Sequence, residues 1–209
     1  SIYSTKSKSS MVRLNEEEQN WLRDNYPMLT YDKEKSIIHG PFFINHRYES
    51  KPIIKATFEI EVRLWRMKNR NEYPIVYNPD NKIKKIAQRK QIFHGDLHIN
   101  VDGTLCLGLP EKFSEYYPHG FQLQSFVSNL SSFFYWVAYY ERYNEAPWPA
   151  ERHGDDARIE YYIEIGDIES IRKMYKSKLG IGIAKSKLRN YLKSEPLRRM
   201  LIKRLLNHE

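Results

Sequence analysis

The sequence predicts an α+β fold in which an antiparallel meander sheet is backed by helices. Three observations support this prediction. Apolar and polar residues alternate over 51–65, which is typical of a strand with one buried face. Apolar residues recur at helical spacing over 121–143. The chain places one helix first, then three or four strands, then further helices, which favours separate α and β parts over a parallel sheet.

The first half of the chain is expected to hold a helix and three strands. Asn15 is a preferred N-cap residue, and Glu18 follows at the spacing of a capping box. A helix is therefore expected from Asn15 to about residue 26, where Pro27 ends it. Strands are expected at 36–45, 51–65 and 74–77. The basic segment 82–90 fits neither pattern clearly.

The second half is expected to be helical. The helix over 121–143 has one broad apolar stripe, which we interpret as core packing: Phe126, Leu130, Phe133, Phe134, Val137 and Tyr140. Pro147 and Pro149 then break the chain. Further helices are expected at 155–165, 168–179 and 184–207, with a hinge at 180–182 and an interruption of the last helix at Pro196.

The net charge of +8 is unevenly distributed. Residues 167–209 contain 12 Lys+Arg and 4 Asp+Glu, so this tail alone carries +8. The remaining 22 basic (34 − 12) and 22 acidic (26 − 4) residues cancel. We therefore divide the 209-residue chain into a flexible arm (1–14), a neutral body (15–166) and a basic helical extension (167–209). Such an extension is either a docking surface for an acidic partner or an ordinary solvated helical face.

Composition excludes several classes of protein. The mean hydropathy is −0.71, and no apolar run approaches the ~18 residues of a membrane span, so no membrane partner is expected. Cys106 is the only cysteine, which excludes a disulfide framework and a cysteine-rich zinc site. A cytoplasmic location is expected, with no cofactor and no metal.

The segment 98–108, His-Ile-Asn-Val-Asp-Gly-Thr-Leu-Cys-Leu-Gly, carries the most informative chemistry. Asp102 and Gly103 are expected to form a tight turn that brings Asn100 across from Cys106. A cysteine thiolate is a good nucleophile and can carry an acyl group as a thioester. An asparagine amide can donate a hydrogen bond to an oxyanion during acyl transfer.

Two interpretations stay open for this segment from its residues alone. His98 can tune the thiol or stabilise the loop. Cys106 can be a nucleophile or, as is common for an isolated cysteine, a small buried apolar residue that follows an ordinary turn.

The segment resembles the active-site signature of ubiquitin-conjugating enzymes, in which His-Pro-Asn and a glycine turn precede Ile-Cys-Leu-Asp. It is more similar to bacterial relatives of these enzymes, which keep His-x-Asn-x-Asp-Gly-x-x-Cys-Leu-Gly. Those relatives also carry a downstream element that Trp-Pro-Ala-Glu-Arg-His-Gly at 148–154 resembles. They occur in antiviral operons, including CBASS-type loci beside a nucleotide cyclase and ubiquitin-like conjugation loci. The order of elements over 15–166 resembles their fold.

The resemblance implies a mechanism. Cys106 accepts a C-terminal acyl group from an activating enzyme and passes it to an amine of a target protein. The donor is a ubiquitin-like modifier or another protein with a conjugatable C-terminus, such as a nucleotide cyclase. Asn100 stabilises the tetrahedral oxyanion, directly or by shaping the loop, and His153 is the candidate base for the amine. The residues expected to support the loop are Asp102, Gly103, Trp148 and Glu151.

Three features depart from the eukaryotic pattern. Ile99 replaces the proline of His-Pro-Asn, the turn before Cys106 is shorter, and Gly108 stands where an aspartate is usual.

The same residues allow other functions. A non-catalytic binding module of this fold is the main alternative, although such relatives usually lack the cysteine. A cysteine hydrolase using Cys106 and His153 would place its nucleophile at a helix N-terminus, whereas Cys106 follows a turn. Nucleic acid is not expected as a partner of the tail, because no base-reading motif is present.

Overall fold

The structure is a computed structural model that describes residues 11–150, 152 and 154–206. The chain divides into two compact units, Ser1–Pro149 and Ala150–Glu209. We call them the sheet unit and the helical unit.

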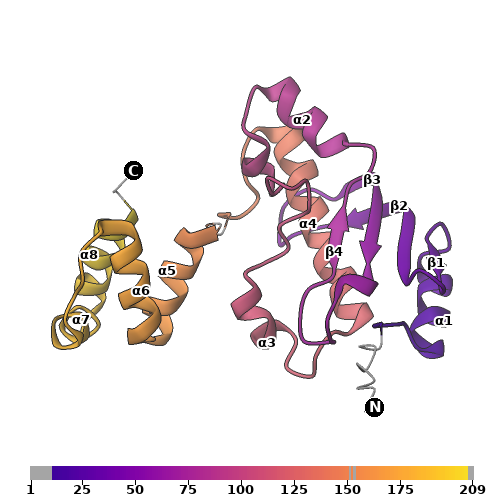
Figure 1. Ribbon diagram of the computed structural model, residues 1–209. Helices are drawn as coiled ribbons and strands as arrows, with labels where there is room; N and C mark the ends of the chain where they lie inside the picture. The colour runs from indigo at the N-terminus through magenta and orange to yellow at the C-terminus, as the bar shows by residue number, and fades with distance from the viewer. Residues whose placement is uncertain (1–10, 151, 153, 207–209) are drawn as a thin grey trace, which may run out of the picture. The chain divides into compact units, whose positions relative to one another are not determined.

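The sheet unit contains a four-stranded antiparallel meander with the strand order β1-β2-β3-β4. Its strands are β1 (Thr30–Asp32), β2 (Ile37–His46), β3 (Ile54–Arg63) and β4 (Ile75–Tyr77). Its helices are α1 (Glu16–Asn25), α2 (Lys82–Lys90), α3 (Phe113–Tyr116) and α4 (Leu123–Tyr143). The α+β class and the antiparallel meander predicted from the sequence are confirmed, and β1 is an additional short strand (Figure 1).

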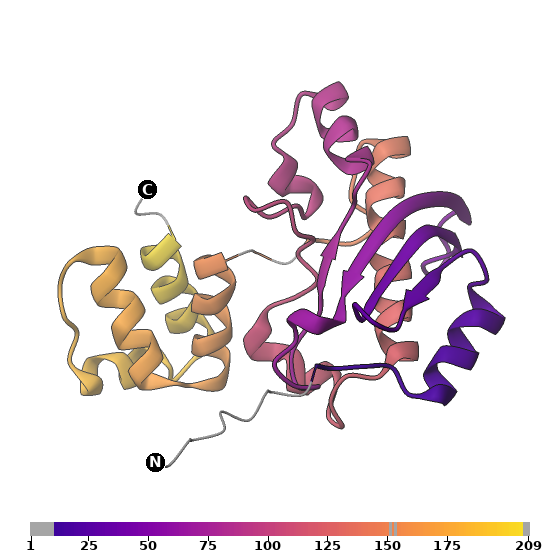
Figure 2. The same cartoon turned by 45° about the vertical axis from the view of Figure 1, so that its right-hand side comes forward.

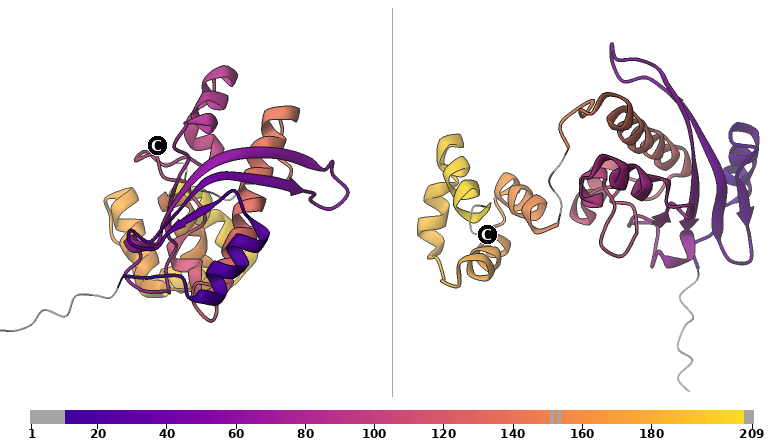
Figure 3. Two further views of the ribbon diagram at one scale, coloured as in Figure 1. Left: turned by 90° about the vertical axis from the view of Figure 1, so that its right-hand side faces the viewer. Right: turned by 90° about the horizontal axis from the view of Figure 1, so that it is seen from above.

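The core of this unit lies between the sheet and α4. The alternation predicted for the longest strand is confirmed, because the inward residues of β3, from Ile54 to Val62, are buried apart from the half-buried Ala56. Phe58 lies opposite Phe42 in the β2–β3 register. The Phe58 ring stacks on Phe134 of α4 with 4.5 Å between ring centroids. Figures 2 and 3 show α4 against one face of the strands.

Helix α1 begins as the sequence predicts. The Asn15 side chain accepts a hydrogen bond from the Glu18 backbone N–H at 2.8 Å, and the Glu18 carboxylate accepts one from the Asn15 N–H at 3.0 Å. This reciprocal capping box satisfies two backbone donors that the first turn of a helix leaves unpaired.

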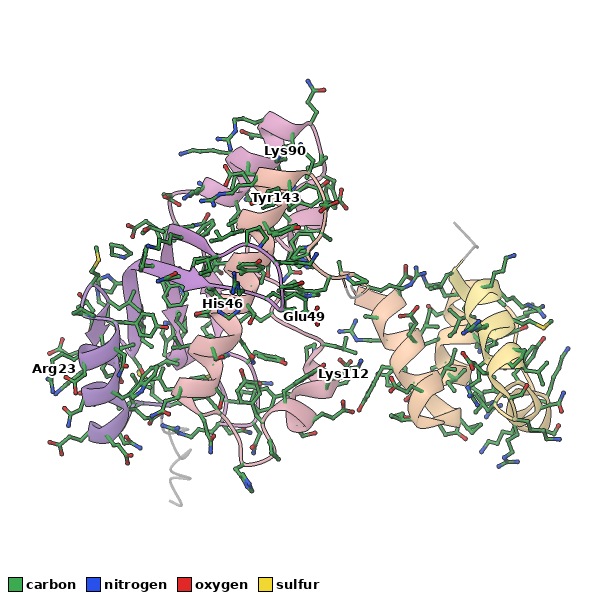
Figure 4. The ribbon with its side chains drawn as sticks, turned by 180° about the vertical axis from the view of Figure 1, so that it is seen from behind. Arg23, His46, Glu49, Lys90, Lys112 and Tyr143 are labelled. Carbon is green, nitrogen blue, oxygen red and sulfur yellow. The ribbon has the colours of Figure 1, made fainter. Side chains whose placement is uncertain are left out.

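The ambiguous basic segment 82–90 is helix α2. Ile83, Ile86 and Ala87 are buried on one side of it, at the i, i+3, i+4 spacing of a helix. The C-terminal ends of α2 and α4 lie together, as the labels Lys90 and Tyr143 show in Figure 4. Arg89 of α2 pairs there with Glu141 of α4 at 2.6 Å.

The helical unit has a core of its own. It contains α5 (Gly154–Ile165), α6 (Ile168–Leu179), α7 (Lys185–Tyr191) and α8 (Glu195–Leu206). Its buried residues are Ile159, Ile163, Ile171, Tyr175, Ile183, Leu188, Leu201 and Leu205. None of the helices described in either unit is long and apolar enough to cross a membrane.

One expectation about this part of the chain was wrong, and another was right except for its position. The boundary expected at 166/167 lies at 149/150, because Ile159 and Ile163 of α5 pack with α6 and α8. The charge distribution placed the start of the second unit at residue 167. Charge reflects the surface of a unit, whereas the extent of the unit is set by its core. The interruption expected in 184–207 is present, but it lies at 192–194, between α7 and α8. Pro196 lies in the first turn of α8, where its missing N–H leaves no helical hydrogen bond unmade.

Candidate active site

Residues 98–106 form a small antiparallel hairpin around the pair Ile99 and Leu105. The Asn100 N–H donates to the Thr104 carbonyl, and the Cys106 N–H donates to the His98 carbonyl, both at 2.8 Å. Ile99 and Leu105 are buried in the core of the sheet unit. Because side chains alternate along extended chain, Cys106 lies on the face opposite to Leu105, where it is half-buried.

The hairpin is attached to the sheet at β4. The Leu105 N–H donates to the Val76 carbonyl at 2.9 Å, and Thr104 forms a bridge with Tyr77. The cysteine segment therefore continues the meander beyond its last strand and is positioned by backbone hydrogen bonds.

The turn predicted at Asp102-Gly103 is present. The Gly103 N–H donates to the Asn100 carbonyl at 2.9 Å. Gly103 has φ +85°, a left-handed conformation that glycine adopts without the steric cost of a side chain.

Thr104 connects the polar side chains of this turn, a role that sequence reasoning missed. The Asp102 carboxylate accepts hydrogen bonds from the Thr104 hydroxyl at 2.6 Å and from its N–H at 3.0 Å. The Asn100 amide donates to the Thr104 hydroxyl at 3.0 Å. The hydrogen bonds from Thr104, that of its hydroxyl first, lower the pKa of the Asp102 carboxyl below its usual value, so the carboxylate stays charged at neutral pH.

Asn100 and Cys106 share one face of the hairpin. Asn100 is paired with Thr104, and Cys106 is two residues beyond Thr104, so the two are diagonal neighbours with Cα atoms roughly 7–8 Å apart. One amide hydrogen of Asn100 is used by Thr104, and a primary amide has a second.

His98 lies opposite Cys106 and packs against α4. Its ring meets Trp136 edge-on with 4.5 Å between centroids, and Phe133 at 5.9 Å. Its backbone has φ +63° at the end of the 3₁₀ segment His94–Leu97. These contacts hold the His98 ring against α4.

Trp148 is linked to Trp136, the residue of α4 that contacts His98. Its ring packs on Tyr48, with 4.5 Å between centroids, and is parallel to Tyr135. Its carbonyl accepts a hydrogen bond from the Trp136 indole at 3.2 Å. Trp136 therefore contacts both His98 and Trp148, which fits the supporting role expected for Trp148. Glu151 and His153 lie outside the described residues.

Helix α2 brings a lysine to the turn. The Lys84 ammonium lies 3.7 Å from the position that a Cβ atom on Gly103 would take. This places a positive charge beside the hairpin that carries Cys106. Since 82–90 could not be assigned from its sequence pattern, this proximity was not predicted.

The structure gives a physical reason for the glycine at 108. A Cβ atom on Gly108 would lie 2.7 Å from the Tyr73 hydroxyl and 3.1 Å from the ring carbon that bears it. Tyr73 is held edge-on against Phe113 and Tyr117, with centroids at 5.0 and 5.9 Å. An aspartate at 108 therefore does not fit beside Tyr73 as it is packed here.

We expect Gly108→Ala to lower the free energy of unfolding by about 1–3 kcal/mol, the usual range for overpacking. Tyr73→Phe removes the oxygen that causes the closest contact. In a double-mutant cycle followed by urea denaturation, the double variant should lose less stability than the two single variants added together. Additive losses would show that the Tyr73 hydroxyl does not exclude a side chain at 108.

The described residues contain no group of three His, Cys, Asp or Glu side chains that could hold a metal ion. Comparisons of the chain with protein-family models, with curated proteins and with solved structures found no match. What the chain does is therefore inferred from the motif and from the geometry of the hairpin.

Proposed function

We propose that this chain is a cysteine-dependent acyl carrier with a fold of the ubiquitin-conjugating type. The observation that supports it most is the hairpin itself. It holds the half-buried Cys106 on the same face as Asn100, with both fixed by backbone hydrogen bonds at 2.8 Å. A buried structural cysteine would lie on the other face, with Leu105.

The proposed reaction has two acyl transfers. In the first, the Cys106 thiolate attacks the thioester of an activating enzyme, a new carbon–sulfur bond forms, and the thiolate of the activating enzyme leaves. In the second, a target amine attacks the Cys106 thioester, a carbon–nitrogen bond forms, and the Cys106 thiolate leaves. The amine loses a proton in this step, and His153 is the candidate acceptor.

Asn100 is proposed to act in the second transfer. Attack by the amine places negative charge on the carbonyl oxygen, and a fixed donor lowers the barrier to this step. The bond to Thr104 orients the amide, and its second hydrogen is the proposed oxyanion donor.

The proposed partners follow from the reaction. They are an activating enzyme, a protein with a conjugatable C-terminus, and a target amine, which we take to be a lysine. Antiviral loci of the kind that hold similar bacterial proteins are the proposed setting, and neighbouring genes would name the donor.

The test is to incubate the purified chain with the activating enzyme and the donor protein encoded beside it. We expect an adduct on a non-reducing gel that disappears when thiol is added. If the donor binds the chain stoichiometrically but no thiol-sensitive adduct forms, the chain is a binding module and the proposal is wrong.

Thr104→Val should slow discharge while leaving loading nearly unchanged. The variant keeps the shape of the side chain but removes the acceptor for Asn100 and the hydroxyl bond to Asp102. Loss of one or two such hydrogen bonds, at about 0.5–1.5 kcal/mol each, corresponds to a roughly 2- to 150-fold slower discharge to free lysine. Thr104→Ser keeps the hydroxyl and serves as the matched control. Equal discharge by both variants would exclude this role of the Thr104 hydroxyl.

A further inference from the structure

Charge is segregated within the helical unit. Helix α5 carries one arginine and four carboxylates, a net charge of −3. Residues 168–206, which form α6 to α8, contain 12 lysines and arginines and only two acidic residues, a net charge of +10.

The acidic residues neutralise only part of this positive charge. Carboxylates of α5 and of the first turn of α6 pair with five cations: Arg152 with Glu160, Arg158 with Asp155, Lys178 with Asp156, and both Arg172 and Lys185 with Glu169. The carboxylates used in these pairs are Asp155, Asp156 and Glu160 of α5 and Glu169 of α6.

Of the other exposed cations, Lys173 acts electrostatically on Asp167, and Arg204 lies over the Tyr175 ring at 5.5 Å. Five more are exposed, and within 154–206 their side chains form no ion pair, hydrogen bond or ring contact. They are Lys176 of α6, Lys187 and Arg189 of α7, Lys193 between α7 and α8, and Lys203 of α8. We call these residues the basic set. Four of them lie on three helices that pack on one another around Leu188 and Leu201, and Lys193 lies on the connection between two of these helices.

Helix α7 displays its polar residues most fully. Leu188 is completely buried, whereas Lys187, Arg189 and Asn190 are exposed, as are Lys185 and Ser186. Lysine, arginine, serine and asparagine are among the side chains that contact the phosphates of nucleic acids.

We propose that the helical unit binds nucleic acid through its phosphate backbone, with the basic set as the contact residues. The absence of a base-reading motif, which argued against nucleic acid from the sequence, does not bear on this mode. Binding to phosphates requires cations alone and is independent of base sequence.

The composition of this surface favours nucleic acid over an acidic protein. The centres of protein–protein interfaces are enriched in aromatic residues and depleted in lysine. Four of the five residues in the basic set are lysines, and α7 exposes no large apolar side chain. In the described part of the unit the exposed large apolar residues are Ile165, Ile181 and Met200, none of which lies in α7.

The test measures binding of the full chain to a fluorescent 20-base-pair DNA duplex and to a single-stranded RNA of the same length by anisotropy. Five phosphate contacts predict that the logarithm of the affinity falls with the logarithm of salt with a slope of about −4 to −5 for the duplex. Reversal of three members of the set, Lys187→Glu, Arg189→Glu and Lys193→Glu, should make the slope shallower by about 3 and weaken binding at 50 mM salt at least tenfold.

The matched control reverses three exposed lysines of the sheet unit, Lys33, Lys35 and Lys68, and changes the net charge by the same amount. The affinity of this control variant for nucleic acid should stay within about threefold of that of the wild type, because charge effects at long range are screened by salt. Both variants should still load Cys106, because the proposal does not depend on the acyl-carrier function.

Three results would overturn the proposal. The first is that neither nucleic acid binds at 50 mM salt, and the second is that the basic-set variant and the control lose affinity equally. The third is that polyglutamate competes as effectively as unlabelled duplex at equal charge. The last result would indicate an acidic protein as the partner.

Discussion

Cys106→Ala should abolish the thiol-sensitive adduct completely. The variant removes the only thiol in the chain, and an alanine at 106 cannot form a thioester. Conjugation of the donor to its target should stop as well. Cys106→Ser should give a thiol-resistant ester or no adduct, since an alcohol is a weaker nucleophile than a thiolate. Non-reducing gels with and without thiol measure both outcomes.

The control for this experiment uses the same lone cysteine. Alkylation of the wild-type thiol before the activating enzyme is added should reproduce the alanine variant. Because Cys106 is half-buried and outside the core, thermal unfolding of the alanine variant should stay close to that of the wild type. Normal conjugation by Cys106→Ala would remove the basis of the proposed function.

Asn100→Ala should slow discharge of the thioester to free lysine by about 10²–10³-fold, the usual effect of losing one oxyanion donor, or ~2.7–4 kcal/mol in the barrier. Loading of Cys106 should change little, because both backbone bonds of the hairpin remain. Single-turnover discharge from the pre-charged chain, with the activating enzyme quenched, separates the two steps.

Val101→Ala is the matched control for Asn100. Val101 belongs to the same turn and is 94% exposed, so its truncation removes no packing from the core. It should discharge at a rate close to that of the wild type. If Asn100→Ala loses loading and discharge equally while the fold is intact, Asn100 shapes the hairpin and does not assist the transfer itself.

The parts of the fold that the sequence predicts are those whose signals are local. Alternation in β3 and the capping box of α1 depend on neighbours a few residues apart, and both are confirmed. Helix α2 was missed because its four lysines and one arginine obscure the spacing of Ile83, Ile86 and Ala87. The end of the sheet unit was placed too late because the packing partners of Ile159 lie on α6 and α8, beyond the segment that charge alone delimits.

In the candidate site, too, local features were predictable and contacts between distant segments were not. The turn at Asp102-Gly103 was predicted from two adjacent residues, and it brings the segment of Asn100 beside that of Cys106. The contact between Tyr73 and Gly108 was not predictable, because it joins residues far apart in the chain that the fold brings together. The link from His98 through Trp136 to Trp148 depends likewise on the position of α4.

The most direct measurement locates the acyl group in the loaded chain by tandem mass spectrometry. Pepsin digestion in acid preserves thioesters, so the peptide that contains residues 98–108 can be recovered with its modification. We predict that the C-terminal residues of the donor are attached to Cys106 through sulfur and that the attachment is lost on treatment with thiol. An acyl group found on a lysine, with Cys106 unmodified throughout the loading reaction, would contradict the proposed function.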